Sequence, residues 1–144
     1  MTKQGLYFDN TTIEIKQIQG EELYSQTIYT IPRTKKNSQN IVMNPKTKRP
    51  FLVQSKDYKN YEKESKLYLT EGKNIDCPVN VQMVFFMPTR RRVDLSNLQS
   101  ACLDLLVNAG VLLDDNCKIV RSHDGSMVLY DKENPRTEVR ITKY

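Results

Sequence analysis

Apolar and polar residues alternate along several short segments of the chain, and a period of two is typical of strands with one buried face. Residues 12–18 alternate strictly, and residues 23–31 are rich in strand-forming side chains until Pro32 ends the run. Residues 79–87 form a nearly continuous apolar run that stops at Pro88. Shorter strands are predicted at 119–120, 127–130 and 137–142. The pattern therefore predicts a sheet of several strands.

Two other segments have the helical period. Residues 55–69 place Tyr58 and Tyr61 on one face and charged side chains on the other. Residues 95–109 carry an apolar stripe that begins after Asp94, a favoured helix N-cap, and ends at Gly110. Residues 32–50 are basic and polar around a small apolar island, which indicates a loop or a loose hairpin. Strands and helices together predict an α/β (α+β) fold.

Composition limits this fold to an ordinary globular domain. The 144 residues suit one domain, with 38% hydrophobic and 27% charged side chains. The first residues lack the pattern of a signal peptide, and no apolar run approaches the roughly 18 residues of a membrane span. We therefore expect a cytoplasmic location and no membrane partner. The three cysteines, at unrelated spacings, predict neither a disulfide framework nor a zinc site.

Positive charge is concentrated in particular segments of the chain. The net charge is +5, which permits a polyanionic partner without requiring one. One cluster is Arg33-Thr34-Lys35-Lys36, with residues 46–49 close behind, and the other is Arg90-Arg91-Arg92. Each cluster is either a solvated loop or part of a surface for phosphate groups.

Carboxylates follow the second basic cluster in a pattern that suits phosphodiester cleavage. Nucleases commonly hold Mg²⁺ with two or more carboxylates near basic residues that bind the flanking phosphates. Asp94 directly follows the arginines, and Asp114 and Asp115 lie beyond the far end of the helix. The alternative is structural, with Asp94 as an N-cap and Asp114–Asp115 as a turn. His123 lies in a polar run that indicates a turn or surface position.

The segment from Met87 to Asp115 resembles the signature of the RusA family of Holliday-junction resolvases. That signature has a basic run, Asp-x-Asp-Asn-Leu-x-Lys, a later Asp-x-Leu, a Gly, and Asp-Asp before an apolar residue. The positions that fit it without a gap are Asp94, Asn97, Leu98, Asp104, Leu106, Gly110, Asp114, Asp115 and Ile119. Residues 29–37 also resemble, more weakly, the family's opening strand and its basic loop. The resemblance divides the chain into an N-terminal extension, residues 1–22, forming an extra strand or hairpin, and a nuclease domain, residues 23–144.

The resemblance implies a homodimer with a mixed sheet packed against helices, and Mg²⁺-dependent paired nicking of four-way DNA junctions in recombination or repair, in a phage or prophage setting. Asp94, Asp114 and Asp115 would be the catalytic residues and hold Mg²⁺, or Mn²⁺ in its place, and no small-molecule cofactor is expected. The residues implied to contact DNA are Arg33, Lys35, Lys36, Arg90, Arg91, Arg92 and Asn97. Contacts to phosphates position a substrate without reading its bases.

Two positions depart from the family pattern. Ser96 stands where the family has its second Asp, and Ser100 stands where it has Lys. These positions are four apart and share a helical face, so a carboxylate and an ammonium group are both replaced by hydroxyls. The alternative to an active nuclease is therefore a weakened or inactive junction-binding protein on the same scaffold. A third interpretation, a basic RNA-binding domain, lacks an aromatic-rich motif to support it.

Overall fold

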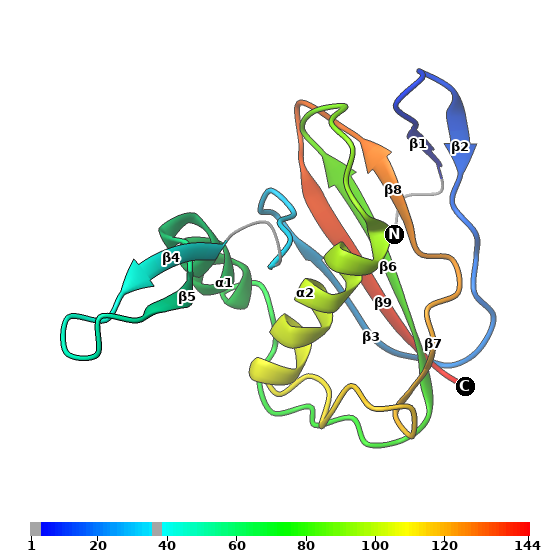
Figure 1. The fold of residues 1–144 in the computed structure, drawn as a ribbon. Helices are drawn as coiled ribbons and strands as arrows, with labels where there is room; N and C mark the ends of the chain where they lie inside the picture. Colours follow the sequence, from blue (N-terminus) through cyan, green and yellow to red (C-terminus); the bar gives the residue numbers. More distant parts are fainter. Residues whose placement is uncertain (1–3, 36–38) are drawn as a thin grey trace.

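One mixed sheet forms the framework of the computed structural model, which describes residues 4–35 and 39–144 (Figure 1). Six of its seven strands follow the order β2-β1-β8-β6-β9-β3, and the seventh, β7, pairs with β6. Strand β6 is antiparallel to β9 and parallel to β7 and β8. The strands are β1 (Gln4–Leu6), β2 (Thr12–Glu14), β3 (Glu22–Ile28), β6 (Val79–Met87), β7 (Val120–Ser122), β8 (Met127–Tyr130) and β9 (Arg136–Lys143). With the two helices below, this confirms the predicted α+β fold with a mixed sheet.

Helices α1 (Lys56–Lys66) and α2 (Leu95–Asn108) lie where the apolar spacing predicted them. The Ser55 hydroxyl accepts a hydrogen bond from the Tyr58 amide and so caps α1. Helix α2 lies across one face of the sheet (Figure 1). Gly110 follows the C-cap residue Ala109, and its positive φ of 73° suits the turn after a helix. Neither described helix is long and apolar enough to cross a membrane.

Strand β6 is buried on both faces, which explains its continuous apolar run. Its odd-numbered side chains, such as Met83 and Phe85, join the main core with α2. Its even-numbered side chains Val84 and Phe86 form a second cluster with Ile15 and Leu129. The N-terminal segment therefore covers the face of the sheet opposite α2.

The predicted strand over residues 12–18 is shorter in the structure, where β2 ends at Glu14. Beyond it the backbone is held by side chains instead of a neighbouring strand. The buried Gln82 amide donates to the Lys16 carbonyl at 2.9 Å, and Arg140 donates to the Ile18 carbonyl at 2.8 Å. The alternation correctly predicted that Ile15 faces inward, since this side chain is buried. It could not predict the hydrogen-bond partners of the backbone, which belong to distant residues.

The basic segment before α1 contains a hairpin, which is one of the two predicted alternatives, a loop or a loose hairpin. Strands β4 (Gln39–Met43) and β5 (Pro50–Gln54) form a separate two-stranded sheet beside α1, away from the main sheet (Figure 1). Apolar side chains of this hairpin are exposed, with Ile41 at 75% and Leu52 at 61%. Exposure of this kind marks a surface that commonly contacts another molecule.

Candidate functional site

Asp94 occupies the N-cap position of α2, but its carboxylate does not cap the helix. The backbone is extended there, and the side chain accepts no hydrogen bond from the amides of the first turn. Asp94 Oδ2 instead accepts a hydrogen bond from Asn97 Nδ2 at 3.2 Å. Because the side chain is exposed, this carboxylate is available to a ligand. The Asp94 side chain therefore does not cap the helix, which was the structural alternative predicted for it.

Arg90 is engaged by the N-terminal hairpin formed by β1 and β2. Its Nη1 donates to the Phe8 carbonyl, and its Nη2 donates to Asn10 Oδ1 at 2.6 Å. The guanidinium also lies 4.3 Å from the centre of the Tyr130 ring, a cation–π distance. Arg90 thus joins the hairpin to β8, so that its role is structural at least in part.

Arg91 and Arg92 differ from Arg90 because both are exposed and neither forms a hydrogen bond or ion pair with any described residue. Arg92 and Asp94 lie together at a surface hollow of about 580 Å³. Tyr7 and Phe8 line the same hollow. Sequence reasoning missed these two aromatic residues, because it could not show that β1 pairs with β8 and so lies near Asp94.

Asp114 and Asp115 lie beyond the other end of α2. The Asp114 carboxylate accepts hydrogen bonds from the Asp115 amide at 2.7 Å and from Asn116 Nδ2 at 3.0 Å. These bonds, the backbone one first, lower the pKa of Asp114 below its usual value of 3.8. Asp114 therefore builds a turn. The Asp115 side chain is exposed and accepts no hydrogen bond from a described residue.

Within one chain the two ends of α2 keep these carboxylates apart. Val111 and Leu112 pack on the last turn, where both amides donate to the Leu106 carbonyl. The loop then reaches the start of β6, where the Val79 amide donates to the Ile119 carbonyl. Asp94 lies at the first turn, and a helix of this length spans about 20 Å. In the described residues no three carboxylate, His or Cys side chains gather as a metal site.

The first basic cluster lies along the same helix. Lys35 Nζ forms an ion pair with Asp104 Oδ2 at 3.3 Å, which places this loop against the middle of α2. Both side chains are substantially exposed, so this pair contributes little stability and leaves Lys35 accessible. Arg33 borders a hollow together with Asp57 and Glu64. Lys36 lies outside the described residues.

Ser96 and Ser100 are exposed positions of the first half of α2, one helical turn apart. His123 is an exposed turn residue whose carbonyl accepts a hydrogen bond from the Ser126 amide. All three cysteines are free thiols, and burial raises the pKa of Cys102 to about 12. The cysteines therefore form no disulfide framework, as their spacing predicted.

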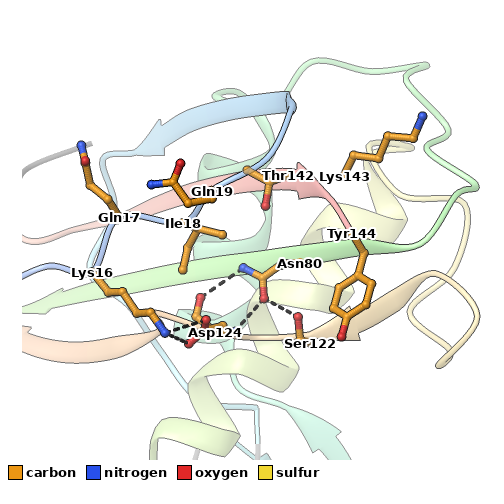
Figure 2. Close-up of a pocket in the computed structure, with 10 residues that line it drawn as sticks. All are labelled: Lys16, Gln17, Ile18, Gln19, Asn80, Ser122, Asp124, Thr142, Lys143 and Tyr144. Atoms are coloured by element: carbon orange, nitrogen blue, oxygen red, sulfur yellow. Dashed lines mark hydrogen bonds and ion pairs between the residues drawn. The ribbon is translucent and has the colours of Figure 1, made fainter.

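A second hollow, of about 400 Å³, lies at the end of the sheet where β6 begins and β9 ends. Figure 2 shows the side chains that line it. Asn80 Oδ1 accepts hydrogen bonds from the Ser122 hydroxyl and the Asp124 amide, while Asn80 Nδ2 donates to the Asp124 carbonyl. Lys16 forms an ion pair with Asp124 at 2.8 Å. This network joins the N-terminal segment to the start of β6, and it accounts for the buried polar side chain of Asn80.

Comparison with known proteins decides the family. A family model described as endodeoxyribonuclease RusA matches residues 31–142, more than half of the chain. The chain belongs to the RusA family. The matched range contains Asp94, Asp114, Asp115 and both basic clusters. The RusA match begins after β1, β2 and β3, so the N-terminal hairpin lies outside it.

Curated RusA relatives match a shorter part of the chain. Crossover junction endodeoxyribonuclease RusA of Escherichia coli (strain K12), and the proteins of that name from Shigella sonnei (strain Ss046) and Enterobacteria phage 82, are each 53% identical over 38 residues. Those residues make up 26% of this chain and 32% of each relative. The chain thus spans about a third of the length of the curated relatives it matches.

Proposed function

We propose that this RusA-family chain is a metal-dependent endonuclease that resolves four-way DNA junctions by paired nicks, acting as a homodimer in the cytoplasm. The carboxylate of Asp94 is the observation that carries this proposal. It is exposed, it is not used to cap α2, and it lies beside Arg92. A spare carboxylate beside basic side chains, within a nuclease family match, suits phosphodiester cleavage.

Arginine and lysine side chains near α2 supply the proposed contacts to DNA phosphates. Arg91 and Arg92 contact backbone phosphates, because their guanidinium groups are exposed and make no bond within the described chain. Lys35 adds a third cation beside the middle of α2, and Arg33 and Lys36 belong to the same loop. Phosphate contacts recognise the path of the strands and not their sequence, which suits an enzyme that selects junction shape.

Mg²⁺ is the metal that suits these residues, with Mn²⁺ as a substitute. Asp94 and Asn97 offer oxygen donors at one end of α2, and Asp115 offers a carboxylate at the other. Mg²⁺ prefers oxygen ligands and needs only one or two carboxylates besides water. When bound, the ion would neutralise charge on the phosphate and lower the pKa of a water. Asp114 supports Asp115 through the hydrogen bond to its amide.

A single ion reaches both Asp94 and Asp115 only if two chains meet, because about 20 Å of helix separates them in one chain. In the proposed dimer, Asp94 of one protomer faces the loop that holds Asp115 in its partner. Exposed apolar side chains suit such contacts. Leu113, next to Asp114, is 57% exposed, and the β4–β5 hairpin exposes Ile41 and Leu52. Two sites related by two-fold symmetry match the symmetry of paired nicks.

Subunit mixing tests this arrangement. Asp94→Asn and Asp115→Asn chains are inactive alone if both carboxylates are needed. After unfolding and refolding together, half of the dimers are mixed, and each mixed dimer has one intact site, so about a quarter of the wild-type sites return. Nicking of a labelled four-way junction with Mg²⁺ is measured. If the mixture stays as inactive as each variant while co-purification of differently tagged chains shows that mixed dimers form, the shared site is ruled out.

The second candidate is a junction-binding protein that has lost cleavage, and Ser96 with Ser100 is the observation that favours it. Both hydroxyls are exposed near Asp94 on the first turns of α2, where the family pattern carries a carboxylate and a cation. Incubating the purified protein with a four-way junction, with and without Mg²⁺ or Mn²⁺, separates the two candidates. Metal-dependent nicks support the nuclease, and binding without nicks supports the second candidate.

A further inference from the structure

The hollow beside Asp94 has a wall that the RusA-matched region does not supply. Residues 31–142 match the family model, whereas Tyr7, Phe8 and Ile13 belong to the N-terminal hairpin. The opposite wall consists of Asp94 with its neighbours and of the residues of β8. The hollow therefore combines residues inside the family match with residues outside it.

Two aromatic rings stand at this hollow in a geometry that suits stacking. The Tyr7 and Phe8 rings lie 5.5 Å apart between centroids, with their planes 23° from parallel. Phe8 also meets the edge of Tyr130 at 6.5 Å. Tyr7 is the outer ring and remains 45% exposed. The stack is supported from behind and leaves the face or edge of Tyr7 accessible to a further flat group.

The hairpin holds these rings in place beside Asp94. Gly5 lies so close to Leu129 that any larger residue would collide with that side chain. Leu6 pairs with Tyr130 of β8. Arg90 adds hydrogen bonds to the Phe8 carbonyl and to Asn10, on the far side of the turn. Three independent contacts thus fix the position of the hairpin, which is what a binding site for a rigid group requires.

We propose that this hollow binds one unpaired nucleotide of a DNA strand, with its base against Tyr7 and its phosphate at Arg92. The inference deepens the proposed function, because it takes the strand beside Asp94 to be the one that is cut. Apolar side chains of Ile13, Met127 and Leu129 line the hollow and suit a base, while Arg92 and the neighbouring Arg91 supply the charge that a phosphate needs.

A nucleotide fits these features together better than an apolar side chain does. The volume of about 580 Å³ is in the usual range for small-molecule sites. Bases stack on aromatic side chains whatever their sequence, and backbone phosphates bind adjacent cations. Taking a base out of a stack costs least where it is already unpaired or strained, as at a branch point. Asp94 repels phosphate, which places the phosphate at the arginine side of the hollow and the neutral base deeper within it.

Equilibrium binding without metal tests the site independently of cleavage. The probes are a five-nucleotide thymidine strand and a four-way junction with 2-aminopurine at its branch point, both in EDTA. Tyr7→Ala should weaken binding of the thymidine strand about tenfold, because one base–aromatic stack is lost. It should also abolish the quenching of 2-aminopurine on binding. Tyr7→Phe keeps the ring and should bind within about twofold of the parent.

Tyr144→Ala is the matched control, since Tyr144 is a 70% exposed tyrosine that borders the other hollow. It should leave both signals unchanged. Unchanged thermal midpoints will show that each variant folds. Parent-like binding of the thymidine strand by Tyr7→Ala overturns the proposal, and so does a loss of dimer mass in this variant, which would make the hollow a subunit contact. If the parent neither binds nor nicks a junction but Tyr7→Ala still weakens thymidine binding, the nucleotide site stands and the proposed resolvase function fails.

Discussion

The two ends of α2 use aspartate in opposite ways. Asp114, beyond the C-terminal end, accepts hydrogen bonds from the Asp115 amide and from Asn116, so that local structure accounts for its carboxylate. Asp94, at the N-terminal end, stands where a carboxylate would cap the helix but accepts a hydrogen bond only from Asn97 among the described residues. The carboxylate builds a turn at one end of the helix, whereas at the other end it is exposed and caps no helix amide. The partner of each carboxylate, and not its position in the sequence, distinguishes the two.

The largest effect on junction nicking is expected from substitution of Asp94. Asp94→Asn should lower the rate of junction nicking by about a hundredfold or more, since a charged group at the reacting phosphate is lost. The thermal midpoint should change little, because no capping hydrogen bond disappears. Single-turnover nicking with Mg²⁺ and a thermal melt measure the two quantities.

Asp114→Asn is the counterpart at the other end of α2. It should lower the thermal midpoint, because Asn has only one acceptor atom to replace the two carboxylate oxygens in the turn. If instead Asp94→Asn melts well below the parent and keeps its nicking rate, then Asp94 is a structural residue and the comparison is reversed.

The sequence predicted the elements of the core far better than their junctions. The apolar run predicted β6 at its observed bounds, because a strand buried on both faces is apolar throughout. The apolar stripe predicted α2, because a helix buried on one face has a period of 3.6. The N-terminal segment was harder to predict, since Lys16 and Ile18 are bonded by the side chains of Gln82 and Arg140, more than sixty residues away. Local pattern contains no information about such partners.

The candidate site shows the same limit. Family resemblance selected Asp94, Asp114 and Asp115, but it contained no distances, and the assembly of a metal site from them stays a proposal. Arg90 was expected to hold a phosphate together with Arg91 and Arg92, whereas its guanidinium is engaged with the hairpin and the Tyr130 ring. Three adjacent arginines look equivalent in a sequence, and only their neighbours in the fold separate them.

Restoring the family pattern next to Asp94 should sharpen the contrast between the two ends. Ser96→Asp with Ser100→Lys adds a carboxylate near Asp94 and a cation one turn along, with no change in net charge. Nicking should rise about tenfold, equivalent to about 1.4 kcal/mol of transition-state stabilisation. Ser96→Asp alone should help less, since an unbalanced carboxylate repels Asp94 when no metal is bound.

Two further results test the Ser96→Asp, Ser100→Lys double variant. Adding Asp94→Asn to it should abolish the gain while junction binding persists, because a negative charge facing phosphate has been removed. If the double variant binds junctions and melts normally but nicks no faster, the N-terminal end of α2 is not the cleavage site, and the junction-binding alternative replaces the nuclease.

A smaller effect is expected within the basic run that precedes Asp94. Arg91→Ala should weaken junction binding and reduce the slope of log affinity against log salt concentration by about one, as expected for one lost phosphate contact. Arg90→Ala should reduce that slope less than Arg91→Ala does. It should instead lower the thermal midpoint, because the hairpin loses its hydrogen bonds to this guanidinium. Equal slopes for the two variants would show that both arginines contact phosphate alike.

The smallest effect concerns acid stability at the other end of α2. Hydrogen bonds from the Asp115 amide and from Asn116 lower the pKa of Asp114 below 3.8 in the folded protein. A carboxyl with a lowered folded pKa stabilises the fold fully above its unfolded value, and the contribution disappears as the pH falls through the folded value. The parent should therefore be more stable than Asp114→Asn near pH 6, and their thermal midpoints should converge as the pH drops below 3.8. A gap between parent and Asp114→Asn that stays constant down to pH 2 would mean that amide geometry, and not the charge of the turn, stabilises this end of the helix.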